Sequence, residues 1–129
     1  MKIDHLAIWV RDLDLAKAFY EKYFNMKSGE KYINETKGFS SYFLSFENSD
    51  TRLEIMHRDD IEDSFFDHSK KLGLTHFAIS LGNKIKVDEL TELLRQDGYK
   101  VVGEPRVTGD GYYESVVEDA EGNWVELTE

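Results

Sequence analysis

The sequence contains no cysteine, a single proline and no long hydrophobic run. The lack of cysteine excludes a disulfide framework, a thiol nucleophile and a thiolate metal site. No apolar stretch approaches the roughly 18 residues that a membrane span needs, and the opening segment MKIDHLAIWV lacks the layout of a signal peptide. We therefore expect a cytoplasmic protein that does not bind to a membrane.

Basic residues are also scarce, with 16 Lys and Arg against 26 Asp and Glu, which gives a net charge of −10. Such a surface repels a phosphate backbone, so nucleic acid is not an expected partner. The length of 129 residues, of which 40% are hydrophobic and 33% charged, fits a packed globular protein. The chain can form one domain or two small fused modules.

The pattern of apolar residues indicates one module that occurs twice along the chain. In the first half we expect a strand, a helix and three strands, at residues 2–10, 11–25, 27–34, 39–47 and 51–57. The same order is expected again at residues 74–81, 85–97, 99–103, 111–118 and 123–128. The polar stretch 58–73 indicates a linker. The predicted fold class is α+β, a single domain of two βαβββ modules (1–57 and 74–129) with curved sheets around a cleft.

Two pairs of similar motifs mark the repeat. DHLAI and THFAI each place a histidine within an expected strand, and RLEIM and WVELT each place a glutamate in the middle of one. His5 and His76 lie 71 residues apart, and Glu54 and Glu126 lie 72 apart. The histidine and the glutamate of the first half are therefore each repeated in the second half after almost the same number of residues.

Strand alternation gives these four side chains a common direction. On each strand the apolar neighbours take the face that packs on a helix, and His5, His76, Glu54 and Glu126 take the other face. A lone histidine or glutamate in a strand is more often a core or solvent-facing residue, but two matched pairs favour a site. Two imidazoles and two carboxylates suit a divalent metal with mixed nitrogen and oxygen ligands.

The motifs DHLAI, RLEIM, LTHFAIS and VVEDAEGNWVELTE resemble those of the vicinal oxygen chelate superfamily, the glyoxalase/bleomycin-resistance/dioxygenase proteins. Within it they resemble the short glyoxalase I (lactoylglutathione lyase) group, and the resemblance covers essentially the whole chain. It implies His5, Glu54, His76 and Glu126 as ligands of Ni²⁺, Co²⁺ or Zn²⁺. Glu54 favours the glyoxalase branch, because three-ligand relatives such as thiol transferases and extradiol dioxygenases do not need it.

The reaction implied by the resemblance is the isomerisation of a small α-hydroxycarbonyl or thiol hemithioacetal. Chelation of two adjacent substrate oxygens acidifies the C–H bond, because the enediolate that forms is stabilised by the cation. Glu126 and Glu54 are both candidates for the catalytic base. The resemblance further implies a homodimer in which His5 and Glu54 come from one chain and His76 and Glu126 from the other, although pairing within one chain stays open.

Two departures from the glyoxalase pattern concern the substrate. Trp9 stands where that group commonly has an arginine for the glutathione carboxylate, and Arg58 stands where an asparagine is usual. Arg58 could contact an anion or could be a solvated linker cation, and Met56 and Tyr113 could line a pocket or belong to the core. We predict substrate contacts from these four residues and weak activity with glutathione itself.

Two other functions stay open. One is an Fe(II) dioxygenase that uses His5, His76 and Glu126 as a facial triad, against which Glu54 argues by filling a position that oxygen or substrate requires. The other is a metal-free ligand-binding module of the bleomycin-resistance kind. Metal analysis distinguishes the lyase and the dioxygenase from the metal-free module, and dioxygen consumption identifies the dioxygenase.

Overall fold

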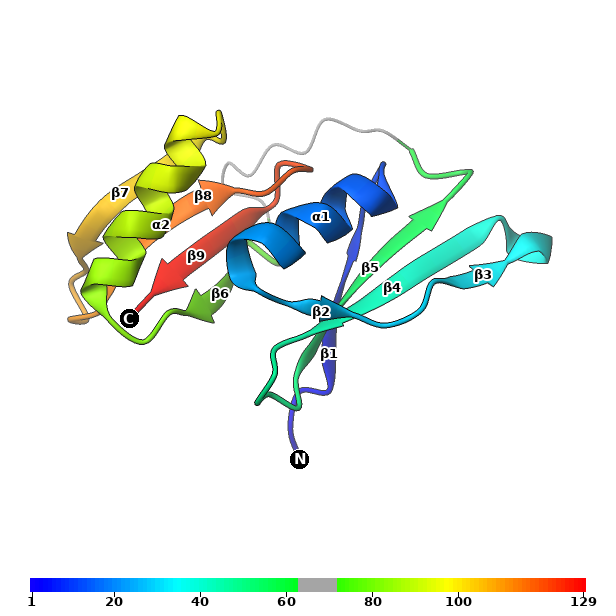
Figure 1. The fold of residues 1–129 in the computed structure, drawn as a ribbon, viewed down its shortest axis with the longest axis horizontal. Helices are drawn as coiled ribbons and strands as arrows, with labels where there is room; N and C mark the ends of the chain where they lie inside the picture. The colour runs from blue at the N-terminus through cyan, green and yellow to red at the C-terminus, as the bar shows by residue number, and fades with distance from the viewer. Residues whose placement is uncertain (63–71) are drawn as a thin grey trace. The chain divides into compact units, whose positions relative to one another are not determined.

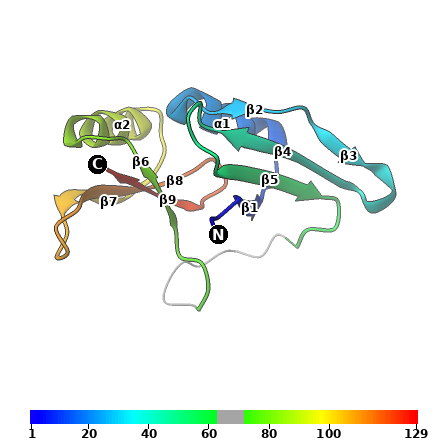
Figure 2. The same ribbon diagram turned by 90° about the horizontal axis from the view of Figure 1, so that it is seen from below.

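The computed structural model describes residues 1–62 and 72–129 (Figure 1). The chain divides into two compact units, Met1–Ser64 and Phe65–Glu129. Within the described residues, each unit contains one sheet and one α-helix that packs on it (Figure 2). This is the predicted α+β class, and each unit is described by itself.

The first unit has a mixed sheet with a parallel edge pair. Its elements are β1 (His5–Trp9), α1 (Leu13–Phe24), β2 (Lys27–Ser28), β3 (Tyr32–Asn34), the 3₁₀ helix η1 (Glu35–Lys37), β4 (Phe39–Ser45) and β5 (Arg52–Arg58). The sheet order is β1-β5-β4-β2, and β3 also pairs with β4. β1 runs parallel to β5, and the other pairs are antiparallel.

The second unit repeats this arrangement with the same connectivity. Its elements are β6 (Phe77–Ser80), α2 (Lys84–Gln96), β7 (Val101–Val107), β8 (Tyr113–Glu118) and β9 (Trp124–Thr128). The order β6-β9-β8-β7 again places the first and last strands side by side and parallel. The predicted doubling of a βαβββ module is therefore confirmed.

The module boundaries stay a prediction. The linker expected at 58–73 falls largely on residues 63–71, which lie outside the described residues. At its start, Arg58 still belongs to β5. In the described part of the chain, no helix is long and apolar enough to cross a bilayer.

Helix α1 begins and ends where its capping residues predict. The Asp12 carboxylate accepts hydrogen bonds from the backbone N–H groups of Asp14 and Leu15, as an N-cap should. Asn25 ends the helix in the left-handed conformation, with φ of 52°. The apolar side of α1 packs on β4 and β5.

The core of each unit lies between the helix and one face of the sheet. In β5, Leu53 and Ile55 are buried, and in β9, Val125 and Leu127 are buried. Because strand side chains alternate, the residue between each pair must point to the face that the helix does not cover. Those intervening residues are the two glutamates of the motifs.

Candidate functional site

The first half-site is formed where β1 runs beside β5. The register places Ala7 opposite Glu54, so His5, two residues before Ala7, lies on the same face as the glutamate. Nε2 of His5 is 3.8 Å from Oε2 of Glu54. The Glu54 side chain is only 14% exposed, and the His5 side chain is 40% exposed.

Glu54 is a partly buried carboxylate with an incomplete set of partners. Among the described residues, His5 lies beside Glu54 and carries the opposite charge when it is protonated. No lysine or arginine of the described residues forms an ion pair with Glu54. Holding a carboxylate in such a position is costly unless a cation or hydrogen-bond donors compensate. The donor chemistry at this point therefore fits a divalent cation.

A second carboxylate binds the other side of the His5 ring. Nδ1 of His5 is 2.9 Å from Oδ2 of Asp4, and Arg52 donates to the same oxygen at 2.6 Å. The hydrogen bonds from His5 and then from Arg52 lower the pKa of Asp4. Sequence reasoning missed Asp4 and Arg52, although they lie inside the motifs DHLAI and RLEIM.

The second half-site has the same backbone geometry. Ala78 of β6 lies opposite Glu126 of β9, and His76 immediately precedes β6. Nε2 of His76 is 3.3 Å from Oε2 of Glu126, whose side chain is 16% exposed. The buried neighbours Val125 and Leu127 hold Glu126 on the face away from α2.

The structure thus joins the four predicted ligands in two pairs, one pair in each unit. No group of three or more potential metal ligands is found among residues 1–62 and 72–129. Each unit therefore offers one imidazole and one carboxylate, His5 with Glu54 and His76 with Glu126. That the two half-sites form a single metal centre stays a prediction.

Sequence reasoning missed a second acidic residue on the ligand face of the second unit. Val116 lies opposite Glu126, and Glu114, two residues earlier on β8, shares its face. Burial and then the charge of Glu126 raise the pKa of Glu114, whose side chain is 14% exposed; Arg106, at 3.7 Å, acts in the opposite direction. A carboxyl group with a raised pKa beside a predicted ligand is a candidate for proton transfer. The sequence did contain a signal for this placement, because strand alternation puts Glu114 on the face opposite to its neighbours Tyr113 and Ser115.

Three of the predicted substrate contacts lie on the Glu54 face of the first sheet. Trp9 is opposite Met56, and the Trp9 ring meets the edge of Phe39 at a centroid distance of 6.2 Å. Arg58 lies two residues beyond Met56, but its guanidinium donates to both oxygens of Asp60, at 2.8 and 2.7 Å. Arg58 is therefore already paired with a carboxylate.

Tyr113, the fourth predicted substrate contact, lies on the opposite face of its sheet. Its hydroxyl donates to Asp88 of α2 at 2.6 Å, and the Lys84 ammonium lies 5.3 Å from its ring centroid. The hydrogen bond to Asp88 and burial raise the pKa of Tyr113. The structure places this residue among the contacts of α2 and apart from Glu126.

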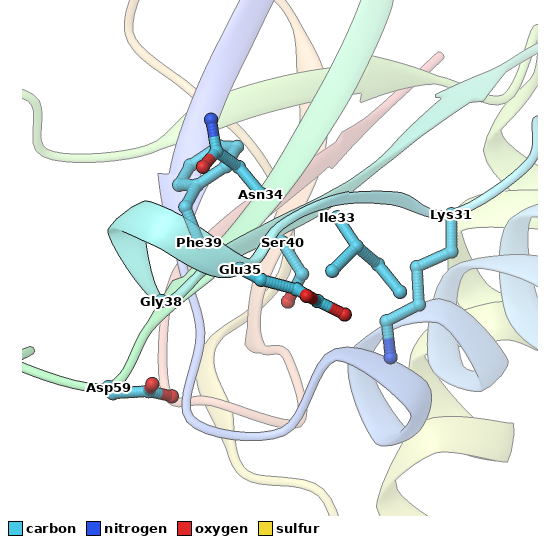
Figure 3. A pocket seen from close by; sticks show the side chains of 8 residues that line it. All are labelled: Lys31, Ile33, Asn34, Glu35, Gly38, Phe39, Ser40 and Asp59. Atoms are coloured by element: carbon cyan, nitrogen blue, oxygen red, sulfur yellow. The ribbon is translucent and has the colours of Figure 1, made fainter.

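A hollow at the end of the first sheet is separate from the half-site. Figure 3 shows its lining around η1, which consists of Lys31, Ile33, Asn34, Glu35, Gly38, Phe39, Ser40 and Asp59. None of the predicted metal ligands is among these residues. The hollow is therefore not the predicted metal site.

Comparison with known proteins relates nearly the entire chain to one family. The profile described as Glyoxalase/Bleomycin resistance protein/Dioxygenase superfamily matches residues 2–127. Two uncharacterised proteins of Bacillus subtilis (strain 168) are similar over nearly all of their length. YqjT is 27% identical over 128 residues, 95% of this chain and 94% of that protein. YwbC is 25% identical over 127 residues, 98% of this chain and 95% of that protein.

Solved structures share the fold. A glyoxalase/bleomycin resistance protein/dioxygenase domain from Frankia sp. EAN1pec has a TM-score of 0.83 at 19% identity, covering 99% of this chain and 96% of that one. The trypanothione-dependent glyoxalase I of Leishmania major has a TM-score of 0.77 at 24% identity, covering 99% and 86%. Glyoxalase I from Zea mays has a TM-score of 0.76 at 25% identity. The match covers 98% of this chain but only 44% of the maize enzyme, so this chain spans less than half of that protein.

Proposed function

The chain belongs to the Glyoxalase/Bleomycin resistance protein/Dioxygenase superfamily, and on that basis we propose that it is a metal-dependent lyase or isomerase of the glyoxalase I type. Its substrate is a small α-hydroxycarbonyl or the hemithioacetal of a thiol. The observation that carries the proposal is the His–Glu pair that recurs on the helix-free face of each unit.

The proposed metal ligands are Nε2 of His5 and His76 together with the carboxylates of Glu54 and Glu126. This set of two nitrogens and two oxygens suits Ni²⁺, Co²⁺ or Zn²⁺ and leaves positions for two substrate oxygens. The ion supplies, when bound, the positive charge that stabilises an enediolate. Each protein chain contributes one half-site per unit, and a homodimer with shared centres is the proposed assembly.

Proton transfer falls to the carboxylates of the chain itself. One of Glu54 and Glu126 removes the proton from the substrate carbon, and the same group returns it to the neighbouring carbon. Both side chains are held between buried strand neighbours, with exposures of 14% and 16%. This fixed and sheltered position favours a short proton path, because bulk water competes poorly for the carboxylate.

The thiol portion of the substrate is expected to differ from glutathione. Trp9 carries a neutral indole, which cannot form an ion pair with a carboxylate, and Arg58 is held by Asp60 through two hydrogen bonds. Neither of these two positions therefore supplies the unpaired cation that the glyoxalase pattern implies. A thiol with fewer negative charges suits this face better.

The test combines metal analysis with a substrate series. Untagged protein is loaded with Ni²⁺, Co²⁺ or Zn²⁺ and assayed with methylglyoxal and glutathione, then with other low-molecular-weight thiols. We expect turnover that depends on the metal, with weak activity towards glutathione. Ligand binding without any retained divalent ion would indicate the bleomycin-resistance type of module instead, and dioxygen consumption would indicate a dioxygenase.

A further inference from the structure

The two ring nitrogens of His5 contact different carboxylates. Nδ1 lies 2.9 Å from Asp4, and Nε2 lies 3.8 Å from Glu54. An ionised carboxylate only accepts hydrogen bonds, so a proton on Nδ1 satisfies the contact with Asp4. The lone pair then lies on Nε2, the atom that faces Glu54.

Asp4 is itself held in place from the neighbouring strand. The Arg52 guanidinium donates to its Oδ2 at 2.6 Å, and the backbone N–H of Arg52 donates to the carbonyl of Asp4 at 3.0 Å. The guanidinium lies 4.2 Å from the ring centroid of Phe43, which meets the His5 ring edge to face at 5.4 Å. Asp4, held by Arg52, thus contacts the Nδ1 side of the imidazole, and Phe43, which lies opposite Glu54 on β4, packs against the ring.

This arrangement contributes little to folding stability. The side chains of Asp4 and Arg52 are 62% and 40% exposed, and ion pairs at that exposure contribute little to the stability of a protein. The contacts do, however, restrict the orientation of the ring and the position of its proton. The arrangement therefore suits a role in ligand geometry better than a role in stability.

The equivalent positions of the second unit do not provide the same support. Thr75 precedes His76 where Asp4 precedes His5, and Trp124 stands two residues before Glu126 where Arg52 stands before Glu54. Neither replacement can provide a carboxylate for a histidine. The two half-sites are alike in their His–Glu pair but unequal in what surrounds the histidine.

We infer that Asp4 is a positioning residue for a metal ion bound at His5, because it keeps the proton on Nδ1 and the lone pair on Nε2. A carboxylate on the far nitrogen of a ligating histidine orients the ring and increases its basicity. The inference rests on the proposed function in that His5 must be a ligand. It adds that the half-site of the first unit is the more strongly preorganised of the two.

The test measures the affinity of Ni²⁺ for the full chain by calorimetry. Asp4→Asn and Asp4→Ala are expected to weaken binding by about 10- to 100-fold, the range typical of such outer-shell partners. Asp50→Asn is the matched control, because Asp50 is also an exposed carboxylate in an ion pair, with Lys2 at 2.7 Å. Its affinity is expected to stay within about twofold of the unaltered protein.

A second readout follows the proton directly. Long-range ¹H–¹⁵N spectra of the metal-free protein show which ring nitrogen is protonated. We expect His5 to be protonated on Nδ1 in the unaltered protein and to lose this preference in Asp4→Ala. The protonation of His76 should be the same in the two proteins. Retention of the Nδ1–H form in Asp4→Ala would overturn the positioning role.

The outcomes separate this inference from the proposed function. If Asp4→Asn and Asp4→Ala bind Ni²⁺ like the unaltered protein while His5→Ala does not, Asp4 has no positioning role and the metal site stands. If His5→Ala also leaves the affinity unchanged, His5 is not a ligand, and both the inference and the proposed metal site fail.

Discussion

Ala7 lies directly opposite Glu54 across the parallel strands β1 and β5. The methyl side chain of Ala7 occupies little of the exposed face, so the His5 imidazole can extend past it towards the carboxylate. The second unit repeats the arrangement, with Ala78 opposite Glu126. A small residue between histidine and glutamate is therefore part of the half-site geometry in each unit.

Enlarging this residue is expected to block the half-site without disturbing the core. Ala7→Leu places a branched side chain beside both His5 and Glu54, and because Ala7 is exposed, the free energy of unfolding should change by less than about 1 kcal/mol. Ni²⁺ affinity, measured by calorimetry, should fall by about 10-fold or more. Ala18→Leu, at an exposed position of α1, is the control and should leave the affinity unchanged. Equal affinities in both variants would show that the space beside Glu54 is not used.

Neutralising Glu54 is expected to affect both metal binding and catalysis. Glu54→Gln removes the charge of a predicted ligand and candidate base, and we expect kcat/KM to fall by about 100-fold or more. Glu35→Gln makes the same chemical change at an exposed position of η1 and should stay within about twofold. Steady-state kinetics on metal-loaded protein, together with metal content, provide the comparison. Equal metal retention and turnover in the two variants would remove Glu54 from the site.

The stability of the metal-free protein is expected to depend on pH through the ionisation of Glu114. Because burial and Glu126 raise the pKa of Glu114 above 4.5 in the folded state, the folded protein holds this proton at pH values where the unfolded chain has lost it. The stability contributed by the protonated group is present at pH values below about 4.5 and is lost as the pH rises through the higher folded pKa.

Glu114→Gln removes this ionisation, so the variant should gain stability relative to the unaltered protein at pH 7 and lose that advantage in acid. Urea unfolding of metal-free protein at several pH values measures the difference. Glu35→Gln, at an exposed position, serves as the control. A constant difference between Glu114→Gln and the unaltered protein at all pH values would contradict the prediction.

Mixing two inactive variants is expected to restore activity if centres are shared between chains. In a heterodimer of His5→Ala and Glu126→Ala, one shared centre contains both lesions and the other contains none. Up to half of the normal activity per heterodimer should therefore return after subunit exchange. If each chain completes its own centre, every centre carries one lesion, and the mixture should stay inactive. Chains of the same variant, mixed under the same conditions, provide the baseline.

Local sequence was sufficient for the ends of α1 and for the faces on which Glu54 and Glu126 lie. Asp12 and Asn25 delimit α1 because capping is a contact between neighbours in the chain. The direction of Glu54 and Glu126 follows from a strand period of two residues and their buried neighbours. The resemblance of the motifs to the glyoxalase group was confirmed at the level of the family and the fold.

Strand pairing decided features that local sequence does not contain. The single strand expected at 27–34 is two strands, because β2 and β3 pair with β4 in registers that differ by one residue. Tyr113, predicted as a substrate contact with a core position as the alternative, lies on the face of its sheet that α2 covers, where its hydroxyl donates to Asp88. Only the packed unit determines which of two faces a helix occupies.

The residues that surround the His–Glu pairs could also not be predicted from the sequence alone. Arg52 reaches Asp4 across 48 residues because β1 pairs with the last strand of its unit and not with the next one along the chain. Glu114 acquires its raised pKa from burial and from Glu126 on the adjoining strand. The ligand types and their spacing are properties of the chain, whereas proton positions and pKa shifts depend on which distant strands the sheet brings together.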